Sequence, residues 1–457
     1  MPAPEIPDGW GLRRASLTEV QIMKIILAPF GSSGDVNPFV GIGVRMRERG
    51  HRVTVMASEH FSSLVESEGL DFVAASTEEE YRRLIDHPEM WDSRKSLAVL
   101  YGAILETSPR LCELIADHYE PGSTVLAAPS LNIGARVAHD KLGIPLASVI
   151  LNPILLRSMH SPGRSPLLQI PSWMGGWGVK LAYKMIDRKY EQMIGEPLNR
   201  IRHSMELPPV RGIAAWMRSP QRIICLWPEW LYERQPDWPA HVETTTFVHY
   251  DGVSTLSGEE KRESDTQERA ESQAETSAQE APIVFTAGTA MSQGKEFFAA
   301  AAEACAISGR PGLLLTQRPE QLPEHLPEGV EHVAYAPFGE LLPTVAAIVH
   351  HGGIGTAARA LEAGIPQVLV PHAYDQFDNS SRFGALGVAA ELPREELSAG
   401  TLSAALDRLL ESSIIAERCR TYAGMVRSKE GLDRTCDLLD ALEATDLSDR
   451  ERPVSTA

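Results

Sequence analysis

The chain has 457 residues, of which 43% are apolar and 23% are charged, so its composition is that of an ordinary globular protein with room for two domains. Lys and Arg number 43 against 61 Asp and Glu, and the resulting net charge of −18 argues against nucleic-acid binding, which requires a basic face. Five scattered cysteines without C-x-x-C spacing favour reduced thiols, and the sequence shows no apolar run long enough to span a bilayer, so we expect a cytoplasmic protein.

Residues 1–22 have no apolar centre of the kind found in signal peptides, and they read as a disordered extension. From Met23 the sequence alternates between strand-like and helix-like stretches, beginning with a strand, a helix over 40–50 and a second strand. The strands predicted in this half are 23–30, 51–58, 124–129 and 145–151. Strands that alternate with helices indicate a parallel sheet covered on both faces, so residues 23–250 form a first α/β domain.

Residues 251–281 are rich in Glu, Ser, Gln and Thr without apolar periodicity, which predicts a flexible linker. The alternation then restarts, with predicted strands at 282–288, 311–317, 330–335, 346–350 and 367–370. Residues 282–444 therefore form a second doubly wound domain, and 445–457 read as a disordered tail.

The first glycine-rich turn, GSSGDVNP at residues 31–38, carries a carboxylate at Asp35, where a phosphate would be repelled. A dinucleotide fingerprint is absent there, because Met46 occupies the position of the third glycine. GTAMSQGKE, from Gly288, departs from the Walker A pattern in its spacing and in its last residue. Asp35 is either the N-cap of a helix that begins near residues 38–39 or a functional group.

The strongest signal lies in AAIVHHGGIGTAARALEAGIPQVLVPHAYDQFDN, residues 346–379. It predicts a strand to His350, a tight turn over 352–355 and a helix over 356–363, whose N-terminus favours a phosphate. His351 can donate a hydrogen bond to that phosphate, and protonation would add charge. Since neighbouring residues on a strand point in opposite directions, one histidine of the pair packs inside and a shared metal is not expected. An ordinary strand-to-helix turn is the alternative.

Other polar groups are predicted at the same edge of the second sheet. Asp375 and Gln376 follow the next strand and suit sugar hydroxyls. Gly288 and Thr289 form a second turn with N–H and hydroxyl donors, and Tyr335 follows another strand, where its ring could stack on a base. Together these groups predict a nucleotide-sugar site.

This pattern resembles the donor-binding signature of glycosyltransferase family 1, whose members have the two-domain GT-B fold, and the likeness is strongest to the rhamnosyltransferases of rhamnolipid synthesis and their bacterial relatives. The resemblance runs from Met23 over nearly the whole chain, through APFGSSGDVNPFVGIGVRMRERGHRVTV, DHPEMWDSRKS and WMRSPQRIICLWPEW. It implies an acceptor domain over 23–250 and a nucleotide-sugar domain over 282–444. The implied activity is transfer of a hexose of the rhamnose or glucose type to a hydroxyl of a lipid-like or other hydrophobic small molecule.

The resemblance also assigns individual roles. The diphosphate contacts are His351, Gly353, Gly355, Thr356, Gly288 and Thr289. Tyr335 would stack on the base, and Asp375 and Gln376 would hold the sugar. Many members have Glu at the position of Arg359, where it holds the ribose, so the contact to the ribose stays open.

Asp35 stands where many members carry a catalytic His, and the resemblance makes it the general base of an inverting, metal-independent displacement without a covalent intermediate. Residues 150–185 are either a mobile apolar lid over the acceptor, a patch that contacts a membrane surface, or an ordinary packed loop and helix. A nucleotide-sugar 2-epimerase and a nucleotide-sugar-binding protein with little catalysis are the alternative functions. The nucleotide base and the sugar of the donor, the identity of the acceptor and the oligomeric state are not fixed by the sequence.

Overall fold

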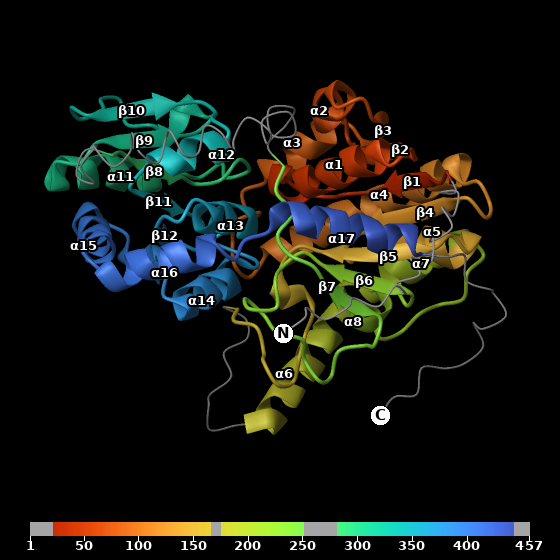
Figure 1. Cartoon of the computed structure of the whole chain (residues 1–457). Helices are drawn as coiled ribbons and strands as arrows, with labels where there is room; N and C mark the ends of the chain where they lie inside the picture. The colour runs from red at the N-terminus through yellow and green to blue at the C-terminus, as the bar shows by residue number, and fades with distance from the viewer. Residues whose placement is uncertain (1–21, 166–174, 251–280, 443–457) are drawn as a thin grey trace, which may run out of the picture.

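A computed structural model describes residues 22–165, 175–250 and 281–442 of the chain. The expected amino-terminal extension, acidic linker and tail therefore lie almost entirely outside the described residues. The rest forms two α/β units, each built on one parallel sheet (Figure 1), which confirms the predicted fold class. No helix in the described ranges is both long and apolar enough to cross a bilayer.

The amino-terminal sheet has seven parallel strands in the order β3-β2-β1-β4-β5-β6-β7. Their bounds are β1 Lys24–Leu27, β2 Arg52–Ser58, β3 Asp71–Ser76, β4 Thr124–Ala128, β5 Leu146–Ile150, β6 Arg222–Cys225 and β7 Val242–Thr244. The helices are α1 Ser33–Glu48, α2 Ser62–Ser67, α3 Glu78–Ile85, α4 Ser96–His118, α5 Ile133–Leu142, α6 Gly175–Tyr190, α7 Glu196–Ser204 and α8 Ile213–Trp216. Strands such as β1 and β4 are apolar without alternation, because α1 and α2 cover one face of the sheet and α4, α5 and α7 cover the other.

The carboxyl-terminal sheet has six parallel strands in the order β10-β9-β8-β11-β12-β13. Their bounds are β8 Ile283–Thr286, β9 Gly312–Leu315, β10 Val330–Val333, β11 Ala347–His350, β12 Gln367–Leu369 and β13 Ala389–Glu391. The helices are α11 Lys295–Ser308, α12 Phe338–Leu341, α13 Ile354–Glu362, α14 Gln376–Leu386, α15 Ala399–Leu410, α16 Ser413–Ala423 and α17 Ser428–Asp440. In each sheet the strand order reverses direction between two central strands, β1 and β4 in the first sheet and β8 and β11 in the second. In doubly wound folds, ligands bind at the carboxyl ends of the strands beside this switch point.

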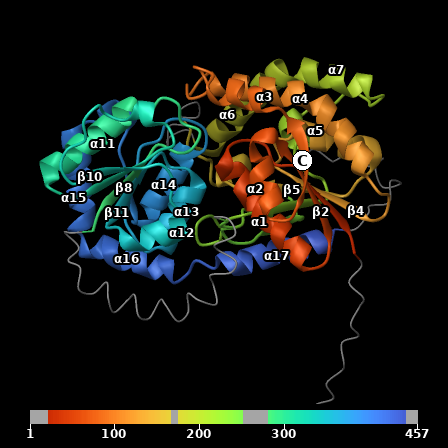
Figure 2. The same ribbon diagram turned by 90° about the horizontal axis from the view of Figure 1, so that it is seen from above.

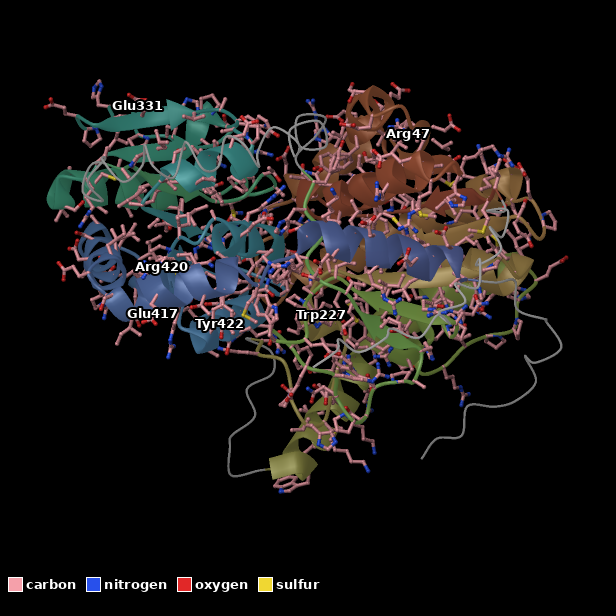
Figure 3. All side chains as sticks on the ribbon, viewed as in Figure 1. Arg47, Trp227, Glu331, Glu417, Arg420 and Tyr422 are labelled. Carbon is pink, nitrogen blue, oxygen red and sulfur yellow. The ribbon has the colours of Figure 1, made fainter. Side chains whose placement is uncertain are left out.

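The two units share an apolar junction. One cluster combines Trp227 and Trp238, which follow β6, with Leu361 of α13 and Phe383 of α14. Figure 3 shows Trp227 on the amino-terminal side of this junction and Tyr422 of α16 on the other side. The junction lies beside the helices that begin at the predicted donor residues, so it fixes how the two sheets face each other.

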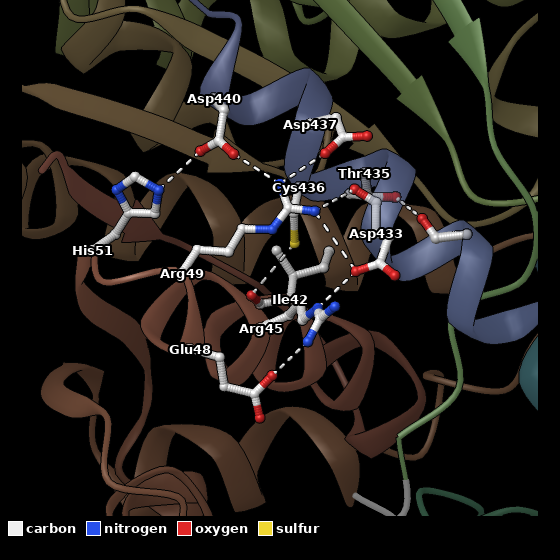
Figure 4. A network of polar contacts seen from close by, with 11 residues as sticks. Ile42, Arg45, Glu48, Arg49, His51, Asp433, Thr435, Cys436, Asp437 and Asp440 are labelled. Atoms are coloured by element: carbon white, nitrogen blue, oxygen red, sulfur yellow. Dashed lines mark hydrogen bonds and ion pairs between the residues drawn. The ribbon is translucent and has the colours of Figure 1, made fainter. Parts of the chain in front are cut away.

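The last helix, α17, leaves the carboxyl-terminal unit and packs along α1, as the view from above also shows (Figure 2). Its apolar residues join the core of the amino-terminal sheet. Arg49, the C-cap of α1, pairs with Asp437 at 2.8 Å and with Asp440 at 2.7 Å, and Arg45 of α1 pairs with Asp433 at 2.6 Å (Figure 4). The carboxyl end of residues 282–444, predicted to belong to the second domain, thus completes the core of the amino-terminal unit.

Candidate active site

The glycine turns that follow β8 and β11 meet around one histidine ring. A Cβ placed on Gly288 would lie 2.7 Å from Cε1 of His351, and one placed on Gly353 would lie 2.5 Å from Nε2 of the same ring. Both positions therefore require glycine, and Gly288 also has a φ of +91°, which favours that residue. The structure thus brings three of the predicted diphosphate residues together at the switch point of the second sheet.

The two adjacent histidines have different environments, as the alternation of a strand predicts. His350 is buried; its Nε2–H donates to Oε1 of Gln367 at 2.9 Å, and its Nδ1 accepts the backbone N–H of Gly352 at 3.1 Å. His351 faces the turns, and its Nδ1 is buried with no hydrogen-bond partner in the described chain. Burial lowers the pKa of His350 to about 4 and that of His351 to about 3. His351 is therefore neutral at pH 7 and can donate a hydrogen bond from its ring N–H. The positive charge that protonation of His351 would add is not available without a ligand.

Helix α13 begins beside this ring, with Gly353 as its N-cap. The helix starts at Ile354, slightly earlier than predicted, so its first N–H groups point toward the space above the turn. Gly355 is exposed and Thr356 is part-buried, and a Cβ added at Gly355 would meet no atom within 4 Å. This end of the helix can therefore bind an anion such as a diphosphate.

Other predicted donor residues lie along the same edge. Thr289 is exposed in the turn after β8, and Tyr335, which follows β10, has 61% of its surface exposed. Arg359, in contrast, is buried and pairs with Glu362 at 2.8 Å, so its guanidinium is engaged inside α13. Within the described ranges no group of three or more His, Cys, Asp or Glu side chains could hold a metal ion.

Asp375 and Gln376 follow β12 and begin α14. Nδ2 of the buried Asn379 donates to Oδ2 of Asp375 at 2.6 Å and to the carbonyl of Gly352 at 2.9 Å, which links the predicted sugar carboxylate to the glycine turn. Oε1 of Gln376 accepts the backbone N–H groups of residues 372 and 373 at 2.8 and 3.0 Å. The side-chain oxygen of Gln376 therefore holds the loop in place, and the side-chain NH₂ group is the part that could contact a sugar.

Asp35 lies at the corresponding switch point of the first sheet, after β1. The N-cap interpretation is wrong: α1 begins at Ser33 with Ser32 as the N-cap, and Asp35 is the third residue of the helix. Its Oδ2 accepts the backbone N–H of Ser32 at 2.8 Å and the Ser32 hydroxyl at 3.1 Å. A Cβ on Gly31, where φ is +130°, would lie 2.3 Å from that oxygen, so this turn needs glycine to seat the carboxylate.

The two predicted functional carboxylates come from different units, and their charges interact. Burial raises the pKa of Asp35, although its hydrogen bonds to Ser32 act in the opposite direction. Burial, with the negative charge of Asp35 as a further cause, raises the pKa of Asp375 to about 6. A carboxylate from each sheet therefore lies within electrostatic reach of the other, beside the glycine turns.

Sequence reasoning missed Tyr374, which stands directly before Asp375. Its φ of +57° is unusual for a tyrosine, and such strain persists where the surroundings hold it. The hydroxyl donates to the carbonyl of Met90 at 2.7 Å, and the ring packs edge-on against Trp91 at 6.0 Å. The segment DHPEMWDSRKS contributes these contacts, but its letters alone do not say what it touches.

An apolar cavity of about 260 Å³ borders the turn that carries Asp35. It lies between α3, α4 and the ends of the first strands, and its lining includes Phe30, Gly31, Val36, Phe61, Leu84, Val99 and Ile104. The sequence directed attention to residues 150–185 instead. There, Arg164 pairs with Glu391, and its backbone N–H donates to Asp378 at 2.9 Å, so this part of the segment is fastened to the carboxyl-terminal unit. Residues 166–174 lie outside the described ranges.

Two stretches of the chain, one in each unit, match known protein families. Residues 25–161 match the glycosyltransferase family 28 N-terminal domain, and residues 313–428 match the C-terminal domain of the erythromycin biosynthesis protein CIII-like family. The chain is 27% identical over 436 residues to O-mycaminosyltylonolide 6-deoxyallosyltransferase of Streptomyces fradiae, an alignment that covers 92% of this chain and 97% of that protein.

Solved structures show the same fold. The glycotransferase of kitacinnamycin superposes with a TM-score of 0.68 at 20% identity, covering 93% of this chain and 100% of that one. The spinosyn rhamnosyltransferase SpnG, in a complex with thymidine diphosphate, superposes with a TM-score of 0.62 at 16% identity, covering 91% of this chain and 100% of that one.

None of these three proteins is named as a rhamnolipid enzyme, so the stronger likeness to that group stays a prediction. The two family matches fall on the two sheets, and the relative from Streptomyces fradiae aligns along nearly the whole chain. This protein is a glycosyltransferase of the GT-B type; residues 25–161 are similar to the family 28 N-terminal domain, and residues 313–428 are similar to the C-terminal domain of erythromycin biosynthesis protein CIII-like proteins.

Proposed function

We propose that the protein transfers a hexose, with inversion and without a metal, from a nucleoside-diphosphate sugar to a hydroxyl of a hydrophobic small molecule. The observation that carries this proposal is the position of Asp35. The turn that carries Asp35 borders an apolar cavity, and the negative charge of Asp35 acts on Asp375, which follows β12 of the other sheet. A base between an acceptor pocket and a donor site is what a direct displacement needs.

In this reaction Asp35 takes the proton of the acceptor hydroxyl as that oxygen attacks the anomeric carbon. Both hydrogen bonds that Asp35 makes in the described structure use Oδ2, so Oδ1 is the oxygen that accepts the proton. The raised pKa of Asp35 makes its carboxylate a stronger base than a solvated aspartate.

The leaving nucleoside diphosphate develops charge at the start of α13. The N–H groups of that helix end and the neutral imidazole of His351 supply the compensating donors, and a partly buried setting strengthens them. Nδ1 of His351 is buried and has no hydrogen-bond partner among the described residues, so a ligand oxygen there would satisfy a group that is otherwise costly to bury. The solved complex of SpnG with thymidine diphosphate supports a dTDP-linked donor for this chain as well.

The cavity beside Asp35 is the proposed acceptor site. Its lining is mainly aliphatic and aromatic, which favours a largely apolar alcohol. We therefore expect the acceptor to contact the lining of this cavity in the first place, and residues 150–185 only in the second.

The test is Asp35→Asn, assayed with dTDP- and UDP-sugars and a panel of apolar alcohols. We expect kcat to fall at least about 100-fold, within the range of a lost general base, while the Kd for dTDP changes less than about twofold. Release of nucleoside diphosphate only when an alcohol is present separates transfer from 2-epimerisation. Unchanged turnover in the variant, or product formed without an alcohol, would refute the proposal.

A further inference from the structure

Helix α6 has an apolar face that the rest of the described chain does not bury. Trp177, Leu181 and Met185 are spaced four residues apart, so they form one ridge, and they are 59%, 47% and 65% exposed. Large apolar side chains with such exposure are few in the described chain, and three of them share this helix. Figure 1 shows the first turns of α6 extending away from both sheets.

The opposite face of the same helix is the one that packs. The hydroxyl of Tyr183 donates to the carbonyl of Ser158 at 3.1 Å, and Arg157 pairs with Asp187 and lies over the rings of Tyr183 and Tyr190 at 5.3 and 5.6 Å. Val179 is buried on that side. Because α6 packs through this face, the ridge that ends at Met185 lies on the opposite side of the helix and points outward.

Basic side chains flank the outward ridge. Lys180, Lys184 and Arg188 form a neighbouring ridge, and all three are exposed together with Lys189. The only acidic residue of the helix, Asp187, is on the packed side with Arg157. A helix with four outward cations is a marked local exception in a chain of net charge −18.

We propose that this face of α6 docks on the surface of an anionic lipid bilayer, with the apolar ridge at the boundary of the acyl chains and the lysines among the headgroups. An apolar stripe beside Lys and Arg is the pattern of helices that lie in the membrane interface. The positive charge complements an anionic surface, whereas the acidic remainder of the protein is repelled by it and is held outward. The proposal extends the proposed function, because an apolar acceptor partitions into the same surface.

The experiment measures co-sedimentation of the full chain with vesicles of phosphatidylcholine alone and of phosphatidylcholine with phosphatidylglycerol. We expect binding to the anionic vesicles only, and loss of that binding in high salt. Leu181→Gln with Met185→Gln, and separately Lys180→Gln with Lys184→Gln, should each weaken binding at least about tenfold.

The matched control is Ile307→Gln with Ile414→Gln, which removes two side chains, each 63% exposed, from α11 and α16. This control should bind vesicles as the parent chain does. Thermal stabilisation by dTDP, which reports on the carboxyl-terminal site, should be the same in all variants, so failure of the membrane proposal and failure of the donor site are distinguishable.

Equal binding to neutral and anionic vesicles, no binding at all, or equal losses in the control would overturn the proposal. Sedimentation velocity covers the remaining occupant of the ridge: a parent dimer that becomes a monomer in the Leu181→Gln, Met185→Gln variant would assign this face to a second copy and also overturn it.

Discussion

Replacing Asp375 with Asn tests whether its carboxylate is held at an electrostatic cost. Burial, and to a lesser extent the negative charge of Asp35, raise the pKa of Asp375 from 3.8 to about 6. A raised carboxylate pKa means that ionisation destabilises the folded protein. The cost is absent below the unfolded pKa and complete above the folded one, so it grows as the pH rises between them. A shift of about 2 units corresponds to about 3 kcal/mol at pH 7.5 and about 1 kcal/mol at pH 4.5.

Asn accepts the same hydrogen bond from Asn379 but carries no charge, so Asp375→Asn should gain stability that depends on pH. The gain at pH 7.5 should exceed the gain at pH 4.5 by about 2 kcal/mol, or about 4 to 8 °C in Tm for a domain of this size. Differential scanning fluorimetry at both pH values measures it, with Glu331→Gln, an exposed carboxylate, as the control. A gain that is the same at both pH values, or a larger loss at pH 7.5, would refute the reasoning.

Three further changes probe other contacts. Tyr374→Phe removes the hydrogen bond to Met90, which is worth about 1 kcal/mol. We expect kcat/KM to fall about fivefold in kinetic assays, while calorimetry shows an unchanged affinity for dTDP. Equal kinetics of the variant and the parent would contradict this role. Gly353→Ala pushes a methyl into the adjacent imidazole of His351 and should weaken dTDP binding at least about tenfold by calorimetry. Gly400→Ala, in open space in α15, should not, and matching affinities of the two variants would count against the turn. Arg49→Met should lower Tm by about 2 to 4 °C, because it unties α17 from α1, and an unchanged melting curve would argue otherwise.

The donor side was largely predictable because it depends on local rules. The ends of neighbouring parallel strands share one edge of a sheet, so Gly288 and Gly353 had to approach each other once the strands were located. Alternation along β11 likewise predicted that one histidine packs inside, and His350 is that residue. The assigned roles at this edge, including base stacking by Tyr335, stay predictions.

Contacts between the units could not be predicted in the same way. The bond from Tyr374 to Met90 joins residues far apart in the chain, and it depends on how two separate sheets come together. The early start of α1 was missed for a local reason: Pro38 suggested a helix start, but the contacts between Ser32 and Asp35 fix the first turn before it. The cavity is also non-local, because its walls come from several strands and from both α3 and α4.

The path of α17 constrains how this enzyme can be recombined with others. Because residues 428–442 supply part of the hydrophobic interior of the opposite half, a chimera joined only within residues 251–280 would carry a foreign closing helix onto α1. Exchanging the donor half successfully therefore calls for two crossover points, the second one just before Ser428, so that each sheet keeps its own native cover.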